Sequence, residues 1–153
     1  MKIGILKEQK SKEKRVAIVP STVSALSKKG YEFFVVSDSG ALSNYSDNDY
    51  KEAGAKIVNQ NDVFNCDIIC KVNAPTDEEV SLLKSGTLFI SLLQTIKEID
   101  CVKKLADKKA SAFSLNLLPR TTLAQKMDVL SSQANIAGYK AVLIGSNHIG
   151  KYM

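Results

Sequence analysis

The chain has 153 residues, of which 44% are hydrophobic and 24% charged, and its formal net charge is +5. This length suits one globular domain with a short extension, and the composition excludes disordered, collagen-like and repeat proteins. No apolar run reaches the ~18 residues that span a bilayer, and no secretory signal is visible, so we expect no direct membrane insertion.

Short apolar runs alternate with amphipathic stretches along the first 115 residues. The runs predict strands at 2–6, 33–36, 56–58, 67–72, 87–92 and 112–115. The stretches between them predict helices from Pro20 to Gly30, from Ser46, at 61–64, from Thr76 and at 97–109. This alternation predicts a three-layer α/β fold with a parallel sheet, flavodoxin-like or Rossmann-like, and we expect the flavodoxin-like strand order.

Ligands of such sheets bind beyond the carboxyl ends of the strands. Only two of the 21 cations are arginines, Arg15 and Arg120, and arginine presents a rigid planar fork to anions. We expect one cleft to gather both arginines with Lys71. The other segments predicted at this edge are Lys7, 71–75, 94–95 and 116–120.

The pattern changes after residue 120, so we predict an α/β domain at 1–120 and a long helix within 121–153. Apolar and small residues recur every three or four positions from Leu123, which predicts one continuous helix with a closely packed face. Its other turns carry Gln125, Asp128, Ser131, Ser132, Gln133 and Asn135. Largely uncharged polar groups at this density favour a ligand or subunit contact, with a plain solvated surface as the alternative.

Other features favour ordinary structural roles. Residues 1–15 hold six cations and two anions, and their mixture with Glu and Gln favours a solvated loop over a nucleic-acid site. The three cysteines are expected to be buried, reduced thiols. The single histidine, His148, has no evident partner, so no metal site is predicted.

A complete active site is not visible in the sequence. The chain has no G-x-G-x-x-G turn, no phosphate-binding loop and no catalytic triad. We therefore predict no catalytic side chain.

Four segments nevertheless resemble one family. They are 14–20 (KRVAIVP), 46–58 (SDNDYKEAGAKIV), 67–75 (DIICKVNAP) and 119–142 (PRTTLAQKMDVLSSQANIAGYKAV). They are similar to the N-terminal domain shared by alanine dehydrogenase and nicotinamide nucleotide transhydrogenase, and the last segment resembles the transhydrogenase alpha subunit. In that family a Rossmann domain follows shortly after the position of residue 153. The resemblance implies that this chain is the first part of an alpha subunit.

The resemblance also implies a cofactor site. In the transhydrogenases the pattern R-x-x-x-x-Q-x-x-D-x-x-S holds the nicotinamide end of NAD(H) across a cleft from the Rossmann domain. Arg120, Gln125, Asp128 and Ser131 match it, and Ser132 follows one turn after Asp128. Arg120 would lie near the nicotinamide and phosphates, Gln125 would contact ribose and carboxamide, and Asp128 and Ser131 would orient these groups. The alternative for each residue is a helix cap or a packing hydrogen bond.

Alanine dehydrogenase uses the same frame differently. Its substrate carboxylate is bound at positions that match Arg15 and Lys71, and it needs a catalytic histidine where this chain has Leu93. Leucine cannot transfer a proton, so this position favours transhydrogenase. Arg15 and Lys71 would then be structural or inherited anion contacts.

The implied function is that of the NAD(H)-binding alpha subunit of a proton-translocating NAD(P) transhydrogenase, which passes hydride between NAD(H) and NADP(H). NAD would be shared with the Rossmann domain, and NADP would lie on a partner subunit. The expected partners are the rest of the alpha subunit, a membrane-embedded beta subunit and a second copy in a homodimer. We expect a cytoplasmic protein held at the inner membrane by its partners, inactive as this chain alone. The alternatives are an alanine dehydrogenase-like fragment, a non-catalytic assembly remnant and, more distantly, a nucleic-acid binder.

Overall fold

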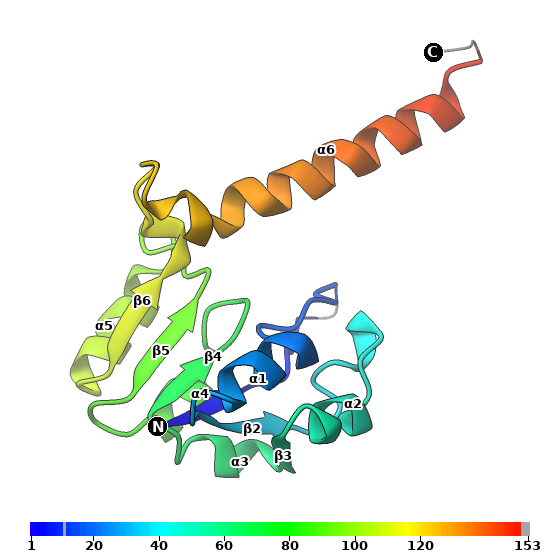
Figure 1. The fold of residues 1–153 in the computed structure, drawn as a ribbon. Coiled ribbons are helices and arrows are strands. Elements are labelled where there is room, and N and C mark those ends of the chain that lie inside the picture. The colour runs from blue at the N-terminus through cyan, green and yellow to red at the C-terminus, as the bar shows by residue number, and fades with distance from the viewer. Residues whose placement is uncertain (11, 151–153) are drawn as a thin grey trace. The chain divides into compact units, whose positions relative to one another are not determined.

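The computed structural model describes residues 1–10 and 12–150, which form two compact units that meet between Ser114 and Leu115. The first unit contains β1 (Lys2–Ile5), α1 (Pro20–Ser27), β2 (Glu32–Val36), η1 (Ala41–Ser43), α2 (Asp47–Glu52), β3 (Ala55–Val58), α3 (Gln60–Val63), β4 (Ile68–Cys70), α4 (Asp77–Leu82), β5 (Leu88–Ser91), α5 (Ile99–Asp107) and β6 (Ser111–Ser114) (Figure 1). The second contains the 3₁₀ turns η2 (Leu115–Leu117) and η3 (Ala124–Met127), then the long helix α6 (Val129–His148).

All strand pairs in the sheet are parallel, and the order is β3-β2-β1-β4-β5-β6. The predicted parallel α/β fold is confirmed, and its order is that of Rossmann-type sheets. The flavodoxin-like order is wrong, because it would place β3 beside β1 in the middle of the sheet. β3 carries Lys56, whose ammonium pairs with Glu32 at 3.0 Å in solvent, so this strand suits an edge.

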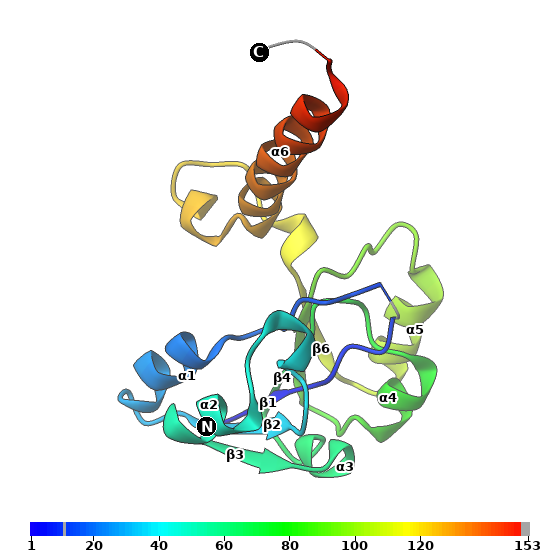
Figure 2. The same ribbon diagram turned by 90° about the vertical axis from the view of Figure 1, so that its right-hand side faces the viewer.

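Helices cover both faces of the sheet, as Figure 2 shows with the sheet seen nearly edge-on. Val23 of α1 and Tyr50 of α2 pack on one face, against a core that includes Ile3, Ile5, Phe33 and Val35. Helices α3, α4 and α5 pack on the other face, against Ile69 and Phe89 among others. Right-handed crossovers explain this division, because the chain moves outward in one direction from β1 to β3 and in the other from β4 to β6.

Two short helices begin with reciprocal caps at the residues where the sequence predicts helix starts. Ser46 caps α2 and Thr76 caps α4, each accepting a hydrogen bond from the backbone N–H three residues ahead. The carboxylates of Asp49 and Glu79 accept the return bonds from the cap residues' own N–H groups. The second cap fixes the Glu79 side chain near the end of β4.

The structure also tests the cysteines, the membrane spans and the metal sites. Cys66 and Cys70 are free and buried, as predicted, and burial raises their thiol pKa values to about 11 and about 12, while Cys101 is half-buried. Over residues 1–10 and 12–150 no helix has both the length and the apolarity needed to cross a bilayer. Within the same ranges, no three His, Cys, Asp or Glu residues form a group that could hold a metal.

Candidate functional site

The carboxyl ends of β1 and β4 lie side by side at the centre of the sheet. The chain leaves β1 toward β2 and leaves β4 toward β5, in opposite directions, so this is the topological switch point of the fold. Sheets of this type bind ligands at such a point. The loop after β1, the turn after β4 and the first turn of α4 supply six side chains that we call the carboxyl-edge cluster: Glu8, Glu13, Arg15, Lys71, Asn73 and Glu79.

Lys71 directly follows β4 and forms a buried ion pair with Glu79. Its Nζ lies 2.7 Å from one carboxylate oxygen of Glu79 and 2.9 Å from the other, and the two side chains are only 2% and 1% exposed. The same carboxylate accepts the N–H of Thr76 at 2.8 Å. The predicted anion-binding lysine is therefore neutralised inside the protein by a partner that the sequence analysis does not identify.

Glu8 ties the loop after β1 to the end of β4. Its carboxylate accepts the backbone N–H of Val72 and, at 2.8 Å, the side-chain amide of Asn73. That amide also lies 3.1 Å from Glu13, so one asparagine joins two carboxylates of the same loop. The prediction of a solvated loop in residues 1–15 is correct for the lysines at 7, 10, 12 and 14, which are exposed. It is wrong for Glu8 and Glu13, which are half-buried and turn inward.

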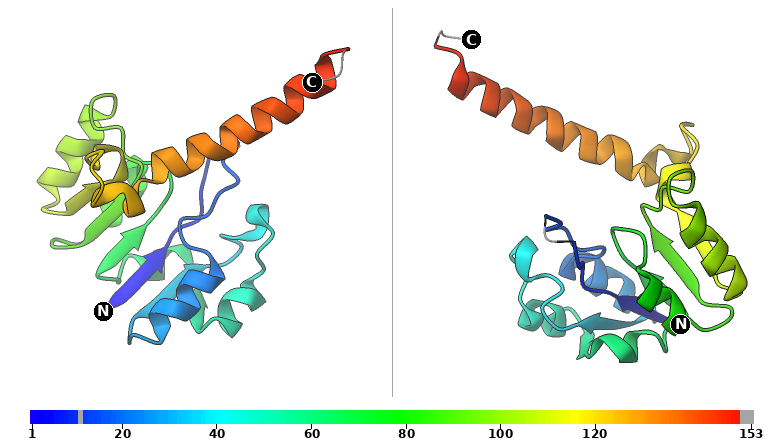
Figure 3. Two further views of the ribbon diagram at one scale, coloured as in Figure 1. Left: turned by 45° about the horizontal axis from the view of Figure 1, so that its top comes forward. Right: turned by 180° about the vertical axis from the view of Figure 1, so that it is seen from behind.

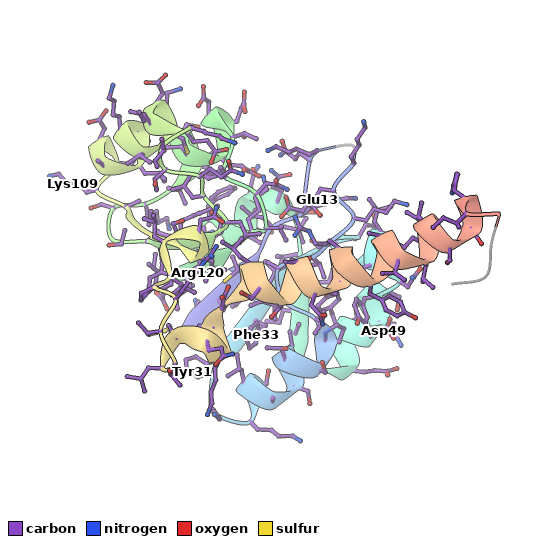
Figure 4. The ribbon with its side chains drawn as sticks, turned by 90° about the horizontal axis from the view of Figure 1, so that it is seen from above. Glu13, Tyr31, Phe33, Asp49, Lys109 and Arg120 are labelled. Carbon is purple, nitrogen blue, oxygen red and sulfur yellow. The ribbon has the colours of Figure 1, made fainter. Side chains whose placement is uncertain are left out.

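Arg15 and Glu13 form a two-pronged ion pair on this loop, where Figure 4 labels Glu13. The Nε of Arg15 donates to one carboxylate oxygen at 2.8 Å and Nη2 donates to the other at 2.7 Å. The side-chain bonds from Arg15, against the opposing effect of burial, lower the pKa of Glu13 to about 2. The structure thus brings Arg15 and Lys71 to one edge of the sheet, each joined to a glutamate.

This depressed pKa predicts an acid-dependent loss of stability. The folded state holds Glu13 ionised down to a pH of about 2, so its contribution is complete above its ordinary pKa of 4.5 and is lost as the pH falls from there toward about 2. After allowance for solvent around Arg15, we expect Glu13→Gln to lower the free energy of unfolding by about 2 kcal/mol at neutral pH. Denaturant titrations at several pH values measure this, with Asp107→Asn, an exposed carboxylate, as control. A wild-type advantage that does not shrink with acid contradicts the assignment.

The other predicted site residues lie in the second unit, around the start of α6. Asp128 caps this helix, because its carboxylate accepts the N–H of Ser131 at 2.9 Å and the hydroxyl of Ser131 at 2.6 Å. Ser132 donates its hydroxyl to the Asp128 carbonyl at 3.1 Å. These bonds from Ser131, followed by the charge of Arg120, lower the pKa of Asp128. The structure therefore groups Asp128, Ser131 and Ser132 by hydrogen bonds at the start of α6.

The predicted continuous helix from Leu123 is wrong. Gln125 lies in η3, Asp128 has non-helical backbone angles (φ −76°, ψ 86°), and α6 begins only at Val129. The physical reason is the short carboxylate of Asp128, which stabilises a helix start better than a helix interior. Gln125, Asp128 and Ser131 consequently lie on a turn, a cap and a first helical turn, rather than along one helix face.

Arg120 lies in the segment between η2 and η3 (Figure 4) and is exposed, as is Gln125. Because Arg120 belongs to the second unit, the predicted cleft that would join it to Arg15 and Lys71 stays a prediction. The roles of Arg120, Gln125, Asp128, Ser131 and Ser132 in cofactor binding also stay predictions.

Helix α6 contains no buried residue, although much of its surface is apolar. Its exposed large hydrophobic side chains are Leu130, Ile136, Tyr139, Val142, Leu143 and Ile144. His148 near its end places Nδ1 2.9 Å from the carbonyl of Ile144, which is a helix-end contact. For α6, both predicted alternatives therefore stay predictions: a ligand or subunit contact, and a plain solvated surface.

Leu93 is the residue that the resemblance to alanine dehydrogenase aligns with a catalytic histidine. Its side chain is 2% exposed and packs in the core with Phe89 and Leu105. An aliphatic side chain in this environment can neither donate nor accept a proton. Leu93 therefore has the role of a core packing residue in this structure.

The first unit is thus a doubly wound α/β domain with a charge-paired switch point, and the second contains two 3₁₀ turns and a capped helix. The family described as alanine dehydrogenase/PNT, N-terminal domain, matches residues 4–137, and the chain belongs to this family.

Three relatives show how the match is distributed. NAD(P) transhydrogenase subunit alpha of Haemophilus influenzae is 39% identical over 152 residues, and the match covers 99% of this chain and 30% of that protein. Alanine dehydrogenase of Staphylococcus haemolyticus is 35% identical, with 99% and 40% covered. The crystal structure of transhydrogenase from Sinorhizobium meliloti matches with a TM-score of 0.94 and 34% identity, covering 99% of this chain and 46% of that one. The chain therefore spans less than half the length of each of the three.

Proposed function

We propose that this chain is the N-terminal part of the NAD(H)-binding alpha subunit of a proton-translocating NAD(P) transhydrogenase, which passes hydride between NAD(H) and NADP(H). The similarity to transhydrogenase alpha subunits along nearly the whole chain supports this function over unrelated ones. The observation that carries the choice within the family is Leu93, a buried aliphatic side chain where amino-acid oxidation would need a proton carrier. Direct hydride transfer needs no such group.

The side chains at the start of α6 fit the nicotinamide end of NAD(H). The Asp128 carboxylate accepts two bonds from Ser131, and a carboxylate has about four acceptor positions, so it can also accept a ribose hydroxyl or a carboxamide N–H. Arg120 supplies a permanent positive charge, and Gln125 supplies both a hydrogen-bond donor and a hydrogen-bond acceptor. Ser132 offers a second hydroxyl beside them. The bound nucleotides supply the hydride chemistry, while these residues orient the ring and help to exclude water.

This function implies specific partners. The rest of the alpha subunit would bind the other half of NAD through a Rossmann domain, and a membrane-embedded beta subunit would bind NADP. The complex would contain two copies of this chain and would lie on the cytoplasmic side of the inner membrane. The chain by itself would bind NAD weakly and would not turn it over.

A chimaera tests the proposal. The chain replaces the segment that it matches in the Sinorhizobium meliloti transhydrogenase, and NADH is titrated into the chimaera and into the chain alone. We expect binding only by the chimaera. Arg120→Ala should weaken it about tenfold to a hundredfold, because a hydrogen bond to a charged group contributes about 1.5–3 kcal/mol. Gln125→Ala should weaken it less, since its bonds are neutral.

Lys140→Ala, an exposed change on α6, is the matched control and should leave NADH affinity unaltered. Equal affinities in Arg120→Ala and this control contradict the assigned site. A folded chimaera that binds no NADH supports the non-catalytic remnant instead. Alanine-dependent formation of NADH by the chimaera would favour the alanine dehydrogenase-like alternative.

A further inference from the structure

The loop between β1 and α1 separates its charges in space. Its acidic side chains turn inward, because Glu8 accepts the backbone N–H of Val72 and the amide of Asn73, while Glu13 pairs with Arg15. Its basic side chains other than that arginine are exposed, and we call them the lysine face: Lys7, Lys10, Lys12 and Lys14. The mixture of cations and anions along the sequence therefore becomes a cationic surface toward solvent.

The lysine face keeps most of its charge unpaired. Among the described residues, Lys10, Lys12 and Lys14 take part in no ion pair. Lys7 lies 3.9 Å from Asp38, and the two side chains are 46% and 69% exposed, so this contact offsets its charge only weakly. The face can therefore attract an external anion over a distance set by the salt concentration.

The backbone beneath the lysine face is held in place. The carbonyl of Lys10 accepts the N–H of Glu13 at 2.9 Å, and the carbonyl of Lys14 accepts the hydroxyl of Ser43 on η1. Glu8 ties the start of the loop to the end of β4. Figure 1 and the rear view in Figure 3 show the loop in blue next to η1 in cyan, at the carboxyl edge of the sheet. Several charges on one ordered loop lose less entropy on binding than charges on a free tail.

The composition of the loop indicates what it binds. Lysine is a compact, hydrated point charge, so several lysines together suit phosphates spread over a surface better than one anion that needs a planar fork. Residues 7–15 include no aromatic side chain that could stack on unpaired bases. They also include no apolar side chain that could enter hydrocarbon, so contact with a membrane would stop at the headgroups.

We propose that the lysine face is a contact surface for the phosphate groups of anionic phospholipids, which holds this chain against a membrane without insertion. The proposal goes beyond the function above, in which partner subunits alone hold the chain at the membrane. Each lysine near an anionic membrane surface raises the affinity about fivefold. The inner side of the loop, with Glu8 and Glu13, stays directed at the switch point, so both sides of the loop can act at once.

Sedimentation of the full chain with lipid vesicles tests the proposal. We expect binding to vesicles of mixed phosphatidylglycerol and phosphatidylcholine, none to pure phosphatidylcholine, and release at high salt. The triple variant Lys10→Gln/Lys12→Gln/Lys14→Gln should lower the affinity for the mixed vesicles about a hundredfold. Its fold should be retained, because these side chains are exposed and unpaired among the described residues.

The matched control removes the same charge from the opposite edge of the sheet. Lys28 and Lys29 lie just before β2 and Lys51 lies just before β3, and all three are exposed. Lys28→Gln/Lys29→Gln/Lys51→Gln should lower the affinity only severalfold. Equal losses in the two triple variants overturn the proposal, because net charge alone would then explain the binding. Failure of the unsubstituted chain to sediment with the mixed vesicles also overturns it.

Two competitors distinguish other sources of phosphate. Inorganic pyrophosphate that displaces the chain from vesicles at matched ionic strength indicates a discrete anion site and overturns the lipid assignment. A duplex oligonucleotide that binds more tightly than the vesicles, with the same dependence on the three lysines, assigns the face to nucleic acid and also overturns it. We expect neither competitor to act at concentrations well below that of the lipid.

Acetylation of lysine amines, followed by mass spectrometry, gives an independent measurement. Mixed vesicles should protect Lys10, Lys12 and Lys14 and leave Lys28 and Lys29 reactive, whereas equal protection of both groups contradicts the proposed orientation. None of these measurements uses NADH. Vesicle binding by the chain together with a chimaera that binds no NADH retains this surface and refutes the transhydrogenase function, and the opposite pair of results has the opposite meaning.

Discussion

Lys71→Met is expected to lower the free energy of unfolding by about 3–5 kcal/mol, because it leaves the Glu79 carboxylate buried without its cation. Both side chains are at most 2% exposed, so water cannot replace the lost partner. Glu79 cannot simply turn outward, since it also accepts the N–H of Thr76 in the cap of α4. Urea unfolding of the chain measures the change.

The double variant Lys71→Met/Glu79→Gln should recover most of this loss. Glutamine can still complete the capping box, and it carries no charge to be buried. Lys104→Met provides the matched control, because it breaks an ion pair with Asp77 of similar length, 2.6 Å, whose members are 48% and 70% exposed. Its cost should be much smaller than that of Lys71→Met, because solvent screens this exposed pair. If Lys71→Met costs no more than the control, the buried pair does not support the fold as described.

Gly4→Ala is expected to destabilise the protein by about 3 kcal/mol through overpacking. A Cβ at Gly4 would lie 2.5 Å from Cγ1 of Val63 and 3.2 Å from its carbonyl oxygen. Val63 is fully buried and β-branched, so it has no free space or alternative rotamer into which to move. Gly4 therefore allows β1 and α3 to pass at close range.

Gly138→Ala is the control for this prediction. Gly138 lies within α6, where an added Cβ meets no atom within 4 Å, so alanine should raise stability by about 0.5–1 kcal/mol through helix propensity. Thermal and urea unfolding compare the two variants. The double variant Gly4→Ala/Val63→Ala should be less impaired than the sum of its single changes. A neutral Gly4→Ala would show that β1 and α3 are not packed this closely.

Local patterns predicted the elements of the first unit well. The strand pattern is recovered with ends that shift by one or two residues, and the helices predicted from Ser46 and Thr76 begin at Asp47 and Asp77. Short-range chemistry explains this success, because a cap or an apolar run acts within a few residues. The strand order is less local, and only the exposure of Lys56 on β3 points to an edge position.

In the candidate site, too, the sequence predicted positions that local patterns determine and missed contacts that depend on packing. Arg15 and Lys71 were predicted at the carboxyl edge and lie there, but their partners were missed. Glu13 is only two residues from Arg15 and could have been found as an internal carboxylate for its guanidinium. Glu79 is eight residues from Lys71, and its role depends on how α4 packs against the end of β4.

The second unit contains the clearest error, and its cause can be located in one residue. The apolar spacing from Leu123 onward is helical, yet the helix starts at Val129, because Asp128 satisfies the free N–H of Ser131 better as a cap than within a helix. The spacing correctly indicated helical structure in this region. The cap preference of Asp128, which determines where α6 begins, was given too little weight.

The order of residues by itself determined the alternation of strands and helices, the helix starts at Ser46 and Thr76, the family and the presence of an aliphatic side chain at Leu93. Each depends on side-chain identity or on neighbours within one turn. Tertiary packing decided which strand lies at an edge and which carboxylate neutralises Lys71. These outcomes depend on contacts between residues distant in the chain, whose free energies exist only once the sheet and its helices have assembled.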